Sequence, residues 1–192
     1  MAQYNGYVEV PHGTFQEWRD ATFGNGYNVD YFAGDQCWDY CALLWRQYGL
    51  TLYTGNGYAR GCWQLMKDEN ARTPFIAIND VNQIKKGDCL VFGATPSNYA
   101  GHICFCDENF LAGSLFVKCL GQNQKGNGSG YPVTSDYIST ASLIGAFRNT
   151  YWQGVEPEPE PEKGYNKHRY NFVLFNRRKR QEKWTKKPLK KR

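Results

Sequence analysis

The chain has 192 residues, of which 41% are hydrophobic and 16% aromatic, enough for a packed core and too many for wholesale disorder. This length predicts one main domain with a short appendage. The apolar runs fall far short of the roughly 20 residues that a membrane-spanning helix needs. The N-terminal segment has neither the basic start nor the apolar stretch of a secretory signal. We therefore expect a soluble protein without an export signal.

The net charge of +5 is unevenly distributed along the chain. Residues 1–162 carry a net charge of −7, whereas residues 163–192 carry +12. From residue 156 to residue 162, Glu and Pro alternate, a composition that favours an extended spacer over helix or strand. We therefore predict a folded domain over residues 1–154, a linker over residues 155–162 and a basic tail over residues 163–192.

Three helices are predicted in the N-terminal half. Residues 14–17 form a capping-box motif that opens a helix over residues 14–22. A polar, glycine-rich loop follows over residues 24–30. The strongest helical pattern covers residues 35–49, where apolar residues recur every three or four positions. A further helix is predicted over residues 60–70.

After residue 85 the pattern changes to short apolar runs separated by Asn- and Gly-rich turns, which is typical of strands joined by hairpins. The runs cover residues 89–92, 102–106, 115–120 and 143–148. Helices followed by an antiparallel sheet predict an α+β domain.

The seven cysteines are an odd number, so a complete disulfide framework would leave one unpaired. No Cys-x-x-Cys pair occurs, which argues against a four-cysteine zinc site. We expect reduced thiols, most of them small buried hydrophobic residues. Cys104 and Cys106 share a strand face with His102, and because no fourth ligand is evident, we interpret this face as sheet packing rather than a metal site.

Two residues, Cys37 and His102, together indicate a catalytic site. Cys37 stands in the first turn of the strongest helix, where the positive end of the helix dipole favours a thiolate. His102 begins an apolar strand far downstream. Each alone is more often a packing residue, but the combination is the arrangement of papain-like thiol hydrolases. In that arrangement the imidazole takes the proton of the thiol and returns it to the leaving amine.

Three short motifs extend this pattern. They are Gln-Cys-x-Asp at residues 36–39, Gly-Asp-x-x-x-Phe at residues 87–92 and Gly-His-Ile at residues 101–103. In this order, over about residues 14–150, they resemble the CHAP family (cysteine, histidine-dependent amidohydrolase/peptidase). The resemblance is greatest to the CHAP domains of bacteriophage endolysins, which cut amide bonds of peptidoglycan, and it implies a papain-like fold.

The resemblance also implies roles for individual residues. Cys37 is implied as the nucleophile, His102 as general base and acid, and Gln36 as a neighbour of the oxyanion. Family members carry a carboxylate where this chain has Gly121. We therefore assign the orientation of the imidazole to Asn123, whose amide can accept its Nδ1–H. The alternative is that Asn123 only shapes the turn that follows.

A calcium site is a further implication, because some phage CHAP domains bind the ion just before the nucleophile. Oxygen ligands at alternate residues suit this hard cation, although the chemistry itself needs no cofactor. The alternative is an ordinary Asx turn. The matching positions are the side chains of Asn28, Asp30 and Asp39 and the carbonyl groups of Phe32 and Gly34.

These observations predict a phage endolysin-like peptidoglycan hydrolase that uses a cysteine nucleophile and stays in the host cytoplasm until its release to the wall. The alternatives are a non-catalytic CHAP-like module that binds cell wall, since the carboxylate is missing, and a bacterial thiol-amidase toxin. We expect the tail over residues 163–192 to bind anionic wall polymers or a membrane surface. A solubilising extension and, less favoured, nucleic-acid binding are its alternatives. Which peptidoglycan bond is cut stays open.

Overall fold

The computed structural model describes residues 3–5, 8–68, 74–124 and 131–153. The chain divides into two units, Met1–Pro157 and Glu158–Arg192, and all described residues belong to the first. The predicted linker and basic tail therefore lie outside the described residues. Among the residues described, no helix combines the length and apolar character needed to cross a bilayer.

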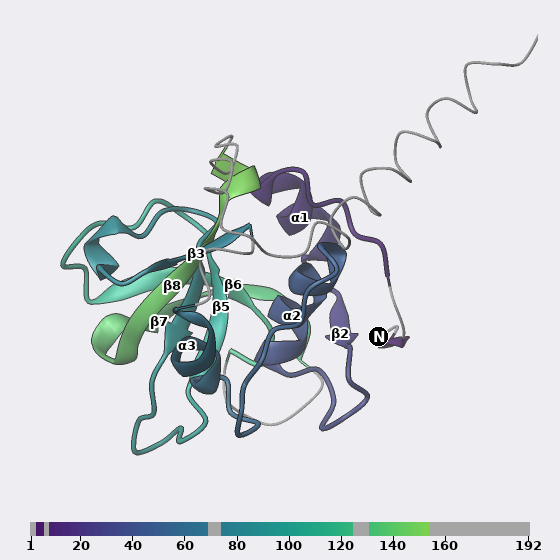
Figure 1. Ribbon diagram of the computed structural model, residues 1–192, viewed down its shortest axis with the longest axis horizontal. Helices are drawn as coiled ribbons and strands as arrows, with labels where there is room; N and C mark the ends of the chain where they lie inside the picture. Colours follow the sequence, from purple (N-terminus) through teal and green to yellow (C-terminus); the bar gives the residue numbers. More distant parts are fainter. Residues whose placement is uncertain (1–2, 6–7, 69–73, 125–130, 154–192) are drawn as a thin grey trace, which may run out of the picture. The chain divides into compact units, whose positions relative to one another are not determined.

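A six-stranded sheet, antiparallel throughout, forms the centre of the described domain (Figure 1). The strands, in spatial order, are β3 (Phe75–Ile78), β8 (Leu143–Asn149), β4 (Cys89–Phe92), β5 (His102–Cys106), β6 (Phe116–Gly121) and β7 (Thr134–Ser139). The central strand β5 pairs with β4 on one side and β6 on the other. A separate parallel pair joins β1 (Gln3–Asn5) to β2 (Gly26–Asn28).

Helices precede the sheet, as predicted. They are α1 (Phe15–Thr22), α2 (Cys37–Gln47) and α3 (Gly61–Met66), with 3-10 turns η2 (Val81–Gln83), η3 (Thr140–Ser142) and η4 (Thr150–Gln153). The capping box of α1 is present, with Thr14 accepting from the N–H of Glu17 and the Glu17 carboxylate accepting from the N–H of Thr14. The predicted α+β fold, with N-terminal helices packed on an antiparallel sheet, is confirmed.

Two strands of the sheet, β3 and β7, and both strands of the parallel pair were not predicted. Strand β7 has a half-exposed to exposed sequence, Thr-Ser-Asp-Tyr-Ile-Ser, because it lies at the sheet edge and shows no apolar run. Strand β3 is short and lies at the opposite edge. Strand β2 falls inside the predicted polar loop, yet all three of its residues are buried. Its burial comes from contacts with distant parts of the chain rather than from an apolar pattern.

The two faces of β5 pack into different apolar clusters. Ile103 and Phe105 join the cluster that contains the buried side chains of α1 and α2, and Phe105 meets the rings of Trp18 and Tyr40. Cys104 and Cys106 join a second cluster. All seven cysteines are free thiols, and six of them are buried, with Cys37 as the exception.

Candidate active site

Cys37 is the first residue of α2, and this helix packs on β5. Its half-buried thiol lies against the start of that strand, where the backbone N–H of Ile103 donates toward the sulfur. Burial raises the pKa of the thiol to about 11 and outweighs the backbone N–H groups of Ile103 and Trp38, which lower it. The resting sulfur is therefore a thiol.

His102 is the first residue of β5, immediately before Ile103, and its side chain is almost fully enclosed at 8% exposure. Burial lowers its pKa to about 4, so the imidazole is neutral near pH 7. The expectation that the dipole of α2 would favour a thiolate at Cys37 is therefore corrected. Burial disfavours both charged forms, the Cys37 thiolate and the His102 imidazolium, and is the largest cause of both pKa shifts.

Gln36 and Asn123, both predicted site residues, are joined by a hydrogen bond. The Asn123 Nδ2 donates to Gln36 Oε1 at 2.9 Å, and Gln36 Nε2 donates to the carbonyl of Ala33 at 2.6 Å. The described residues show no hydrogen bond between Asn123 and His102, and Asn123 Oδ1 is buried without a partner. Asn123 has a positive φ of 50°, a conformation that Asn tolerates well and that fits the turn-shaping alternative.

Gln122, which sequence reasoning left without a role, links three elements of the site. Its fully buried side chain accepts from the N–H of Tyr27 at 2.7 Å and donates to the Tyr27 carbonyl at 2.9 Å. It also donates to the carbonyl of Gln36 at 3.0 Å. It therefore holds the end of β6, strand β2 and the residue before the nucleophile in one network. In the sequence, the feature of Gln122 that indicated a role in the site was its position next to the predicted site residue Asn123.

The Gly-Asp motif before β4 has a structural part in this framework. Asp88 is fully buried and accepts two hydrogen bonds from Arg148 of β8, at 2.9 Å to Oδ1 and 2.7 Å to Oδ2. Its Oδ2 also accepts from the N–H of Lys85 at 2.8 Å. Burial raises the pKa of this carboxyl despite the neighbouring guanidinium. The motif thus anchors the strands around the site rather than joining the chemistry.

A cavity of about 200 Å³ opens beside His102. It lies between the β4–β5 connection, the end of β6 and the segment from β7 to η3, and Cys37 is not part of its lining. Its lining residues are Phe92, Gly93, Thr95, Asn98, Gly101, His102, Asn123, Gln124, Ile138, Ser139 and Ser142. The structure therefore brings Cys37 to the backbone of β5 next to His102, while the ring of His102 borders a space shared with Asn123 and Gln124.

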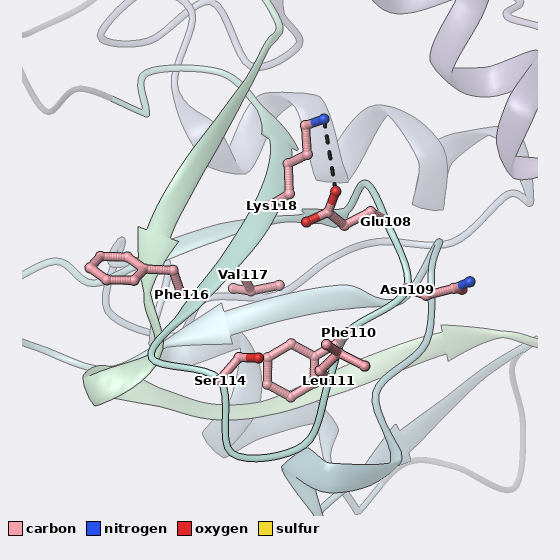
Figure 2. Close-up of a pocket in the computed structure, with 8 residues that line it drawn as sticks. All are labelled: Glu108, Asn109, Phe110, Leu111, Ser114, Phe116, Val117 and Lys118. Carbon is pink, nitrogen blue, oxygen red and sulfur yellow. Dashed lines mark ion pairs between the residues drawn. The ribbon is translucent and has the colours of Figure 1, made fainter.

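Figure 2 shows a second hollow, of about 70 Å³, that is separate from this site. It lies where the segment after β5 faces β6, and an ion pair of 3.9 Å between Lys118 and Glu108 borders it. Its other lining residues are Asn109, Phe110, Leu111, Ser114, Phe116 and Val117. None of these residues is a nucleophilic cysteine or a histidine, so we do not assign chemistry to it.

The predicted calcium positions run from Asn28, the last residue of β2, through the connecting loop to Asp39 in the first turn of α2. Asp39 Oδ1 accepts from the N–H of Val29 at 2.8 Å, and Asp39 Oδ2 accepts from that of Gln36 at 3.0 Å. Asp30 Oδ1 accepts from the N–H of Phe32 at 2.8 Å, which is the geometry of an Asx turn. Burial, with a smaller contribution from the Asp30 charge, raises the pKa of Asp39 to about 7.

Two oxygen atoms of this loop are buried without a hydrogen-bond partner, Asn28 Oδ1 and Asp35 Oδ1. Asp35 was not predicted as a ligand, and burial raises the pKa of its carboxyl. Among the described residues, no group of three or more His, Cys, Asp and Glu side chains is placed to hold a metal ion. A cation here would therefore depend on Asn28 and backbone carbonyls as well as on Asp30 and Asp39, a donor set of oxygens that fits calcium.

Fold and site together define a class of protein: an α+β domain that sets a cysteine, at the N-terminus of a helix, against a strand that begins with a histidine. No family model matches the chain. The chain is 33% identical over 149 residues to a D-alanyl-L-alanine endopeptidase of Streptococcus phage B30, a match that covers 71% of this chain and 31% of the relative. The chain thus spans about a third of the length of that relative.

The fold is similar to the crystal structure of the wild-type endolysin LysIME-EF1. The TM-score is 0.56 with 22% sequence identity, over 70% of this chain and 63% of that one. Together, the relative and the shared fold confirm the predicted resemblance to phage endolysins.

Proposed function

We propose that this chain is a peptidoglycan hydrolase that cuts an amide bond of the bacterial wall with Cys37 as nucleophile. The observation that carries the proposal is the position of the Cys37 thiol at the N-terminus of α2, against the strand that His102 begins. The relatedness to a phage D-alanyl-L-alanine endopeptidase supports the choice of substrate.

The reaction starts from the neutral thiol of Cys37 and the neutral imidazole of His102. As Cys37 Sγ attacks the scissile carbonyl carbon, its proton passes to the His102 imidazole. The imidazolium then gives this proton to the leaving amine, and a thioester remains on Cys37. The N-terminus of α2, with its backbone N–H groups and its dipole, stabilises the negative oxygen of the tetrahedral intermediate. Water, deprotonated by His102, hydrolyses the thioester and restores the thiol.

A surface formed by the exposed rings of Tyr58 and Tyr99 and the half-buried side chain of Arg60 lies next to His102 and suits a peptide stem. The Arg60 guanidinium lies 4.2 Å from the centroid of the Tyr99 ring and 5.6 Å from that of Tyr58. The Arg60 backbone N–H donates to the carbonyl of Ala100 at 3.1 Å, which places this surface beside Gly101. Arg60 makes no ion pair with any residue that the structure describes, so its charge is available for a carboxylate of the stem.

We further propose a calcium ion at the β2–α2 loop, held by the side chains of Asn28, Asp30 and Asp39 and by the carbonyl groups of Phe32 and Gly34. Support comes from the unpartnered, buried Asn28 Oδ1 and from the mutual repulsion of the Asp30 and Asp39 charges. A bound cation would offset this repulsion and fix the loop that leads into Cys37. The anchoring of the basic tail, over residues 163–192, to anionic wall polymers or a membrane surface likewise remains a proposal.

The test is a comparison of the full chain with Cys37→Ala and Cys37→Ser on purified peptidoglycan. We expect turbidity to fall and new amino termini to appear with the full chain only, and mass spectrometry of the products to identify the bond. The second candidate, a binding module without activity, is favoured by one feature, Gly121 in place of the family carboxylate. Binding to walls without any release of amino termini would support the module and refute the hydrolase.

A further inference from the structure

Gly121, the last residue of β6, stands beside the side chain of Gln124. A Cβ atom at Gly121 would lie 2.8 Å from the Cβ of Cys104 and 3.5 Å from both Cδ and Oε1 of Gln124. A contact below 3.0 Å between two such carbon atoms requires a shift. The absence of a side chain at Gly121 therefore avoids a clash with Cys104 of the paired strand β5, and the amide of Gln124 lies at ordinary contact distance from the same position.

The orientation of the Gln124 amide is fixed by its neighbours. Its Nε2 donates to the carbonyl of Cys119 at 2.9 Å and to the carbonyl of Thr134 at 2.7 Å. Carbonyl oxygens only accept hydrogen bonds, so the nitrogen must occupy this side and Oε1 must point away from it. The Gln124 Oε1 is buried and has no hydrogen-bond partner among the described residues.

His102 has the complementary unpaired atom. Its Nε2 is also buried without a partner, and His102 and Gln124 line the same cavity. Gln124 is the side chain that acts on the imidazole as a hydrogen-bond partner, raising its pKa against the larger effect of burial. Catalytic hydrogen bonds are often long in a free enzyme and shorten in the complex with substrate.

We propose that Gln124 is the positioning residue of His102, with its amide oxygen accepting a ring N–H of the imidazole in place of the carboxylate that Gly121 lacks. This inference rests on the proposed function. Asn123 Oδ1 is likewise buried without a partner in this cavity, but the side chain that acts on the imidazole of His102 as a hydrogen-bond partner is that of Gln124. With Nε2–H held by Gln124, Nδ1 is free to take the thiol proton. A neutral amide stabilises the imidazolium less than a carboxylate, in keeping with the low pKa of His102.

The first test measures the tautomer and the titration of the His102 imidazole and needs no substrate. Nitrogen-15 NMR of the full chain should show His102 as the Nε2–H tautomer. In Gln124→Ala we expect a mixture of tautomers and a shift in the titration of His102. Gln47→Ala is the matched control, because Gln47 is another half-buried glutamine that bonds backbone groups, those of Val8 and Val10, away from the site. It should leave the His102 signals unchanged.

The second test is kinetic. Gln124→Ala should lower kcat about 10- to 100-fold with little change in KM, because general acid–base catalysis contributes about 10²–10⁴-fold and only the orientation of the base is lost. Unchanged tautomer, titration and kcat in Gln124→Ala, with a change in Asn123→Ala, would overturn the proposal and return the role to Asn123. If the full chain cuts no peptidoglycan, the proposed function fails, while the NMR result still decides the role of Gln124.

Discussion

The side chain of Gln122 pairs with the backbone of Tyr27 as a neighbouring strand would, accepting its N–H at 2.7 Å and donating to its carbonyl at 2.9 Å. The two residues are 95 positions apart. Because the same amide also bonds the carbonyl of Gln36, the network extends to the residue before Cys37. The position of the nucleophile thus depends on a glutamine at the end of β6.

Gln122→Ala should therefore reduce both stability and turnover. The substitution removes the hydrogen bonds between the Gln122 amide and the buried backbone of Tyr27 and Gln36, and the loss of a partner of a buried polar group costs about 1–3 kcal/mol. We expect a loss of about 3 kcal/mol in urea unfolding and a clear fall in activity on peptidoglycan. The exposed Gln16 of α1 is the matched control, and Gln16→Ala should change stability by no more than about 0.5 kcal/mol. Equal stabilities of the two variants would contradict the role of Gln122.

Activity should persist at acidic pH, down to about pH 5, because the pKa of His102 is lowered to about 4. Protonation removes the general base, so kcat/KM should be level above about pH 5 and fall tenfold per pH unit below the pKa. An unburied imidazole would instead lose activity below about pH 6.5. His12→Gln should keep the wild-type profile, since the His12 imidazole bonds the carbonyl of Val10 and contacts the Tyr48 ring rather than a residue of the site. An acid limb near pH 6.5 would show that His102 is not desolvated in the working enzyme.

Arg60→Ala should raise KM for peptidoglycan several-fold with little effect on kcat. The reason is that the surface formed by Arg60, Tyr58 and Tyr99 binds the substrate but does not react with it. Arg60→Lys should recover part of the loss, since it keeps the charge without the planar fork. Lys67→Ala, which removes an exposed cation paired with Asp68, is the control. A fall in kcat at constant KM would refute a purely binding role.

Arg148→Ala should destabilise the domain by about 3–5 kcal/mol, because it leaves the fully buried Asp88 charge without its partner. Thermal and urea unfolding measure this loss. Lys118→Ala removes a cation from a more exposed pair with Glu108, at 3.9 Å, and should change stability by less than about 1 kcal/mol. Comparable losses in the two variants would show that the Asp88–Arg148 pair is not structural.

Chelation tests the proposed calcium loop. EDTA should lower the melting temperature and activity of the full chain, calcium should restore both, and Asp30→Asn should abolish the response. Asp80→Asn is a close control, because Asp80 Oδ1 accepts from the N–H of Asn82 in the same local geometry as Asp30 with Phe32. A melting temperature indifferent to EDTA and calcium would remove the metal from the proposal.

The sequence by itself determined the elements whose causes are local. The capping box that starts α1, the apolar repeat of α2 and the apolar run of β5 all act within a few residues, so their patterns could be recognised in the chain. The same holds for the positions of Cys37 and His102 at the starts of their elements.

Only the tertiary structure decided the features that depend on distant contacts. The edge strand β7 has no apolar run, and the charge states of Cys37 and His102 follow from burial rather than from the helix dipole that the sequence indicated. Gln124 and His102 line the same cavity because β5 and β6 pair, and Gly121 permits the close approach of Cys104 between these strands. Desolvation and pairing between strands are properties of the packed chain, so no local pattern encodes them.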